Sequence, residues 1–225
     1  MFGERASRVI SLRGMTVHTN LEAVAIMAAT GFLGHSWLEA VLIVASFALG
    51  TGLHLACHLA VAVAFGKGID RMVLTRAGRI DYSGAPPGFL EGIGRTAAGA
   101  TMNALCAIVG YTLIAKVDTS QWPHFAALAL HTFAWCSLIL TIINFLPAIP
   151  LDGGLILQRV LERFVGEAKA LVGAVIVSAV VMTAMIVVGV IRLQPVLVYL
   201  GVVITYDNWR KHVSTRRTET LRQSA

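Results

Sequence analysis

The chain alternates between long apolar stretches and short polar segments. Residues 21–66 are nearly all apolar. As one helix they would be about 69 Å long, more than twice the roughly 30 Å hydrocarbon core of a bilayer. The stretch must therefore fold back, and Gly34-His35-Ser36 is the most suitable place for the turn. The pattern then predicts six membrane-spanning helices, at about residues 20–34, 37–66, 93–116, 124–146, 169–191 and 194–207.

A different pattern lies between the second and third predicted spans. Residues 72–82 alternate loosely between apolar and polar, with Ala77-Gly78 near the centre, which is typical of a short β-hairpin. The segment Ala85-Pro86-Pro87-Gly88 ends this hairpin and leads into the next span. The sequence therefore predicts an all-α polytopic membrane protein with one short cytoplasmic hairpin near 72–82. We expect a single membrane domain over residues 1–225, since no internal repeat is evident.

Composition and charge support a membrane location and predict an orientation. The chain is 56% hydrophobic and 13% charged, with a mean hydropathy of +0.75, which excludes a soluble globular domain. If both termini are cytoplasmic, all but two of the 18 Lys and Arg residues, Lys116 and Arg192, lie on the cytoplasmic side. This is the distribution that the positive-inside rule requires. The pI of about 9.7 then follows from topology, so we expect the bilayer, and no nucleic acid, as a partner.

Three polar side chains in this apolar sequence are candidates for a metal site. His54 and His58 are four residues apart on a predicted helix, so they share a face and can bind one ion. Hydrogen-bonded packing of the pair is the alternative. Asp152 follows Pro147 and Pro150, which break the fourth predicted span, and a carboxylate at membrane depth is costly unless it is paired or metal-bound. Two histidines and one aspartate would leave the fourth position of a zinc ion open to water.

At these residues the chain resembles the site-2 protease family of intramembrane zinc metalloproteases, and its compact bacterial and archaeal members in particular. The resemblance covers nearly the whole chain and rests on three motifs in the family's order. The family's H-E-x-x-H motif, with a following Ala and Gly, aligns with His54, His58, Ala62 and Gly66. Its A-G-P-x-x-N pattern aligns with Ala98, Gly99, Ala100 and Asn103. Its N-x-x-P-x-x-x-L-D-G pattern aligns with Asn144, Pro147, Leu151, Asp152 and Gly153.

The resemblance implies a site, a cofactor and a location. It implies that His54, His58 and Asp152 bind Zn²⁺. It also implies that Asn103 and Asn144 contact the substrate backbone or order the site, although interhelical hydrogen bonding would explain both asparagines equally well. The expected location is the cell membrane of a bacterium or archaeon, and the expected partner is a single-span membrane protein. The oligomeric state stays open.

Two residues depart from the family pattern. Ala100 replaces a proline, which should relax the local backbone without disabling chemistry. Leu55 replaces the glutamate that serves as general base, a role typically worth about 10² to 10⁴ in rate. Glu39 lies about 22 Å from His54 along the same predicted helix and cannot substitute. The remaining glutamates are expected near membrane boundaries, at Glu22 and Glu91, or in a loop after Asp152, at Glu162 and Glu167.

Three functions remain open on this evidence. The first is a pseudoprotease that binds transmembrane segments and has lost most or all proteolysis. The second is an active intramembrane metalloprotease that uses another base. The third is a metal-binding or transport-related membrane protein, although the spans lack the second polar cluster that a pathway would need.

Overall fold

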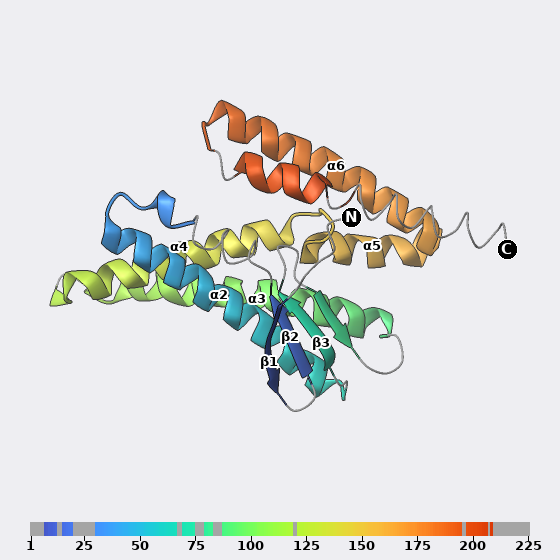
Figure 1. Cartoon of the computed structure of the whole chain (residues 1–225), viewed down its shortest axis with the longest axis horizontal. Coiled ribbons are helices and arrows are strands. Elements are labelled where there is room, and N and C mark those ends of the chain that lie inside the picture. Colours follow the sequence, from blue (N-terminus) through green and yellow to red (C-terminus); the bar gives the residue numbers. More distant parts are fainter. Residues whose placement is uncertain are drawn as a thin grey trace. The chain divides into compact units, whose positions relative to one another are not determined.

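The computed structural model describes residues 7–12, 15–19, 30–66, 69–74, 79–82, 87–118, 121–194, 197–206 and 208. These residues form two compact units, Met1–Asn144 and Phe145–Ala225. Figure 1 gives the order of the elements along the chain.

Three long helices form the body of the first unit: α2 (Trp37–Ala64), α3 (Phe89–Lys116) and α4 (His124–Phe145). The 3-10 turn η1 (Thr30–Leu33) precedes them. α2 begins directly after the turn predicted at Gly34-His35-Ser36. Ser36 caps it by accepting a hydrogen bond from the backbone N–H of Glu39, while the Glu39 carboxylate accepts one from the backbone N–H of His35. This reciprocal cap breaks the long apolar run at a defined place.

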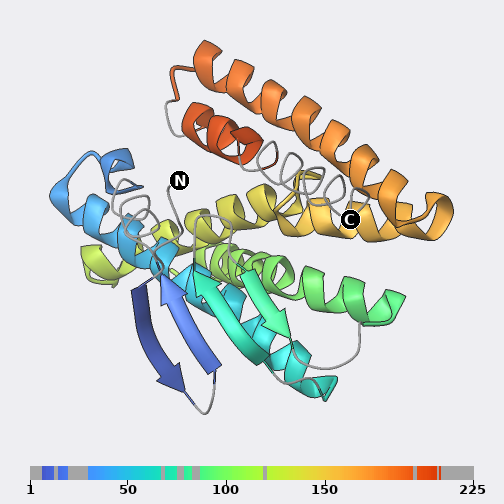
Figure 2. The ribbon, with the colours of Figure 1, turned by 45° about the vertical axis from the view of Figure 1, so that its right-hand side comes forward.

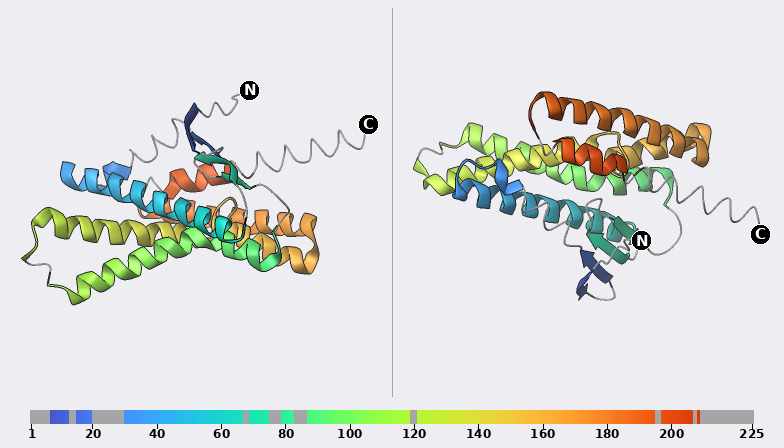
Figure 3. Two further views of the ribbon diagram at one scale, coloured as in Figure 1. Left: turned by 90° about the horizontal axis from the view of Figure 1, so that it is seen from below. Right: turned by 45° about the horizontal axis from the view of Figure 1, so that its top comes forward.

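Small residues let the helices of the first unit approach closely. The buried residues of α2 recur every three or four positions and form one stripe, made of Ile43, Ser46, Gly50, His58 and Ala62. His54 continues the same spacing. α3 contacts α2 and presents a corresponding buried stripe rich in glycine and alanine. Close approach through small residues is the usual packing of membrane helices, and α2 and α3 lie side by side along part of their length (Figure 3). This packing leaves the two histidines against α3.

A four-stranded sheet completes the first unit. Its strands are β1 (Ser7–Leu12), β2 (Met15–Thr19), β3 (Ile69–Leu74) and β4 (Arg79–Tyr82), in that order across the sheet (Figure 2). β1–β2 and β3–β4 are antiparallel pairs, and β2–β3 is parallel. The hairpin predicted near 72–82 thus lies within β3–β4, which begins earlier, at Ile69. The predicted all-α class therefore holds for the helices but leaves out this sheet. The sheet could not be predicted because β2 and β3, which pair in parallel, are far apart in the sequence and no local pattern connects them.

The second unit contains α5 (Asp152–Val165), α6 (Glu167–Ile191) and a shorter apolar helix, Leu197–Tyr206. Its core includes Ala148, Met182 and Ile204. The expectation of a loop after Asp152 is wrong, since Glu162 lies within α5 and Glu167 begins α6. α5 carries its charges among apolar residues at helical spacing, so it is amphipathic. Such a helix contains no long continuous apolar run, which is why the hydropathy pattern did not predict it.

Four helices of the described residues are long and apolar enough to cross a membrane: α2, α3, α4 and α6. They correspond to four of the six predicted spans, and the chain is an integral membrane protein. The predicted first span, 20–34, lies mostly outside the described residues. The predicted sixth, 194–207, is the ten-residue helix Leu197–Tyr206, which is shorter than the roughly 20 residues needed to cross. The count of six spans is therefore not supported.

Leu193, just after α6, has a left-handed backbone with φ of 53°. This conformation costs a residue with a Cβ about 1–2 kcal/mol. The Leu193 side chain is 86% exposed, so Leu193→Gly should lose little packing. We expect this substitution to raise the free energy of unfolding by up to about 1 kcal/mol, which would be measured as a higher melting temperature in detergent. Leu193→Ala is the matched control, because it removes the same side chain but keeps the Cβ. A lower melting temperature in the glycine variant would contradict the prediction.

Candidate metal centre

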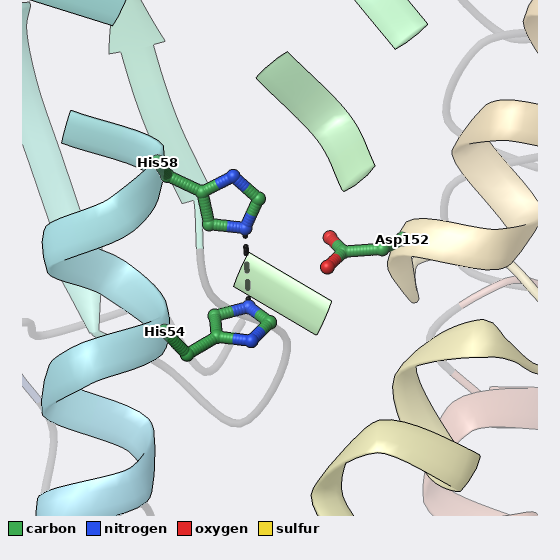
Figure 4. Close-up of side chains that lie close together, drawn as sticks. All are labelled: His54, His58 and Asp152. Carbon is green, nitrogen blue, oxygen red and sulfur yellow. Dashed lines mark hydrogen bonds between the residues drawn. The ribbon is translucent and has the colours of Figure 1, made fainter. Parts of the chain in front are cut away.

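His54 and His58 present their Nε2 atoms to each other from successive turns of α2. The two Nε2 atoms are 3.1 Å apart, and the ring planes are inclined by 75° (Figure 4). In tetrahedral zinc sites the Zn–N distance is about 2.0–2.1 Å, which puts two nitrogen ligands about 3.3 Å apart. The spacing of the two Nε2 atoms therefore suits two ligands of one zinc ion.

α3 holds the far side of each imidazole ring. His58 Nδ1 lies 2.6 Å from the backbone oxygen of Arg95. Because a carbonyl oxygen only accepts, Nδ1–H donates, and Nε2 keeps its lone pair for a metal. His54 Nδ1 lies 3.2 Å from Nδ2 of Asn103, which is fully buried. As the side chains lie, the Asn103 amide N–H donates to Nδ1, so the His54 ring proton is on Nε2 and is directed at the Nε2 lone pair of His58. Rotation of the amide by half a turn would present Oδ1 to the ring, so that Nδ1–H donates and the Nε2 lone pair becomes available to a metal.

Gly99 leaves unfilled the space that a Cβ would occupy beside the two Nε2 atoms. A Cβ on this residue would lie 2.5 Å from Nε2 of His54 and 2.5 Å from Nε2 of His58. Gly99 lies on α3 one turn from Arg95 and one turn from Asn103, so these three residues face the histidine pair together. With the Asn103 amide rotated in this way, the first unit provides two oriented nitrogen donors and a gap beside them, which fits a zinc ion.

The carboxylates on the helices of the first unit lie far from this gap. Glu91 is two turns before Gly99, about 12 Å along the α3 axis, and forms an ion pair with buried Arg95 at 3.2 Å. Glu39 is held in the cap of α2. Asp118 lies beyond the opposite end of α3. Leu55, half-buried next to His54, offers no polar atom.

Asp152 begins α5 in the second unit and is buried, with 8% of its surface exposed (Figure 4). A compact turn of the preceding backbone presents it. The N–H of Leu151 donates to the carbonyl of Ala148 at 2.8 Å, and the N–H of Leu155 donates to the carbonyl of Leu151 at 3.0 Å. These bonds join the irregular segment before Asp152 directly to the first turn of α5.

The two asparagines predicted to contact substrate have different surroundings. Asn103 lies against His54, as described above. Asn144 donates from Nδ2 to the carbonyl of Leu140 in its own helix, at 2.8 Å. The orienting carbonyl of Arg95 carried no sequence signal, because every residue type has a backbone oxygen. Gly99 was visible in the second motif, but its closeness to both Nε2 atoms was not.

Comparison with known protein families matches residues 15–188, more than half of the chain, to Peptidase family M50. The chain belongs to peptidase family M50. This is the site-2 protease family, whose members are zinc metalloproteases, and the resemblance found in the sequence is confirmed. The fold is similar to that of the site-2 protease from Methanocaldococcus jannaschii, with a TM-score of 0.65 and 19% sequence identity over 91% of this chain and 94% of that chain. No curated protein matches the sequence.

Proposed function

We propose that this M50 member binds zinc within the membrane and recognises transmembrane segments of single-span proteins, with lost or strongly reduced proteolysis. The observation that carries the proposal is the contrast between an ordered histidine pair and the leucine beside it. His54 and His58 are spaced as ligands of one metal ion and are held by α3, whereas Leu55 has no group that can move a proton. On this proposal the metal-binding part of the chemistry is kept, and position 55 no longer supplies the proton transfer.

The proposed ligand set is His54, His58 and Asp152. Together they offer two imidazole nitrogens and one carboxylate oxygen, a donor set typical of catalytic zinc sites. Zinc bound there would lower the pKa of a bound water and polarise a carbonyl. The chain's own residues orient the donors: the carbonyl of Arg95 acts on His58, and the amide of Asn103 acts on His54.

Peptide hydrolysis also needs a group that takes a proton from water and returns one to the leaving nitrogen. Leu55 occupies the position of that group in the family motif. Glu91 lies two turns from Gly99 on α3 and is paired with Arg95, and Glu39 is held in the cap of α2. Neither carboxylate is placed to replace the general base, which supports the proposed loss of efficient cleavage. Asn103 and Asn144 remain the proposed contacts for a substrate or partner backbone.

The proposed orientation puts both termini in the cytoplasm of a bacterial or archaeal cell, with the β3–β4 hairpin on the same side. The distribution of Lys and Arg supports this orientation. The occupant of the site is a transmembrane segment of a single-span protein.

The first test is the zinc content per chain of detergent-purified protein. We expect about one zinc per chain in the native protein and a loss of zinc in His58→Ala and in Asp152→Ala. His131→Ala is the matched control, because His131 is exposed on α4 and should leave zinc unchanged. A folded native protein without zinc would overturn the metal centre.

The three candidate functions separate in three further assays. A pseudoprotease co-purifies with an intact single-span partner. An active protease releases product peptides that disappear in Asp152→Ala, and a transporter moves metal across a liposome membrane. Efficient cleavage that depends on Asp152 would overturn the proposed loss of activity.

A further inference from the structure

We propose that Ser178 and Asn208 are positioning residues for the metal centre. They form a clamp, called here the Ile149 clamp, that holds the backbone segment leading into Asp152 and thereby sets the affinity for zinc. The inference rests on the proposed role of Asp152 as a ligand. It concerns two residues that lie 26 and 56 positions after Asp152 and belong to none of the family motifs.

The clamp binds both polar groups of one backbone residue. The N–H of Ile149 donates to Oγ of Ser178, on α6, at 2.7 Å. Nδ2 of Asn208 donates to the carbonyl of Ile149 at 2.5 Å. Ser178 is fully buried, and Asn208 is 7% exposed. Both hydrogen bonds are thus made out of contact with water, where a missing partner is costly.

The clamped residue is tightly connected to Asp152. Ala148, Ile149 and Leu151 form a compact turn, in which the N–H of Ala148 donates to the carbonyl of Leu146 at 2.7 Å. The same turn continues into α5 through the bond from Leu155 to Leu151. Gly153 and Gly154, which follow Asp152, pack closely against the preceding backbone, since a Cβ on either would overlap backbone atoms of Phe145 or Ala148. A shift at Ile149 is therefore transmitted to the Asp152 carboxylate.

The location of this segment in a membrane protein explains why polar side chains hold it in place. Irregular backbone in a membrane is tolerated only where protein satisfies its N–H and C=O groups, and the segment before α5 is irregular. Two polar side chains converging on one residue give that segment a single position. Residues that orient a metal ligand from outside the ligand set typically change affinity by 10- to 100-fold when replaced.

The test measures the zinc dissociation constant by competition with a chelator, alongside the melting temperature of the metal-free protein. Asn208→Asp keeps the side-chain shape but removes the donor to Ile149, and Ser178→Ala removes the acceptor. We expect each to raise the zinc Kd by about tenfold or more. Ser178→Thr keeps the hydroxyl and should retain an affinity near the native one. It also keeps the test decisive if Ser178→Ala fails to fold.

Thr205→Val is the matched control for the last helix. Its hydroxyl donates only to the carbonyl of Gly201 in the same helix, at 2.7 Å, so its loss should leave the zinc Kd within about twofold. If Asp152→Ala raises the zinc Kd but Asn208→Asp and Ser178→Ala leave it unchanged, the proposed role of the Ile149 clamp is wrong while the metal centre stands. This holds even if both clamp variants have a lower melting temperature. A native protein without zinc would overturn the clamp together with the metal centre.

Discussion

Gly99→Ala is expected to weaken zinc binding by about 10- to 100-fold while the helices still form. The added Cβ would lie 2.5 Å from the Nε2 atoms of His54 and His58, so either α3 or the rings must move. Overpacking of this kind costs about 1–3 kcal/mol, and each 1.4 kcal/mol corresponds to a factor of ten in affinity. The measurement is the zinc Kd in detergent, with circular dichroism to verify helix content.

Gly94→Ala provides the control on the same helix. A Cβ on Gly94 meets no atom within 4 Å, so the change adds helix propensity without steric conflict. We expect Gly94→Ala to bind zinc as the native protein does. Native affinity in Gly99→Ala would show that the gap beside the two Nε2 atoms is not where the ion binds.

Leu55→Glu is expected to raise the cleavage of a bound single-span substrate by about 10² to 10⁴. The substitution returns a proton-accepting carboxylate to the residue after His54, the place of the general base in the family motif. The measurement is the rate of product-peptide formation in detergent or liposomes, with zinc content determined on the same preparation.

Leu55→Gln is the matched control, because it has the size and polarity of glutamate but cannot act as a base at neutral pH. Leu55→Glu combined with Asp152→Ala should lose any gained activity. If Leu55→Glu binds zinc and substrate but does not cleave faster, the missing base is not what limits the reaction, and the substrate-binding part of the site has diverged as well.

The parts of the site that depend on local spacing could be predicted from the sequence. His54 and His58 are four residues apart, and a helix then places them on one face whatever surrounds it. The turn before Trp37 was also predictable, because Ser36 and Glu39 form a cap within four residues. The sequence likewise predicted the four long apolar helices.

The remaining features depend on contacts between distant segments. α3 orients His54 through Asn103, 49 residues away, and the Ile149 clamp uses Asn208, 59 residues after Ile149. The pairing of β2 with β3 crosses a whole membrane helix. α5 was missed for a different reason, since its alternation of charged and apolar residues follows helical spacing but does not produce an apolar run.

The two histidines differ in how evolution can alter their support. His54 is held by a side chain, that of Asn103, so a single codon change can remove its partner. His58 is held by the main chain at position 95, which substitution at that position leaves in place. An alignment of relatives would therefore reveal the first support and hide the second. An insertion or deletion in α3 before Arg95, which turns the following residues by about 100° per residue, would move both supports away from their rings at once.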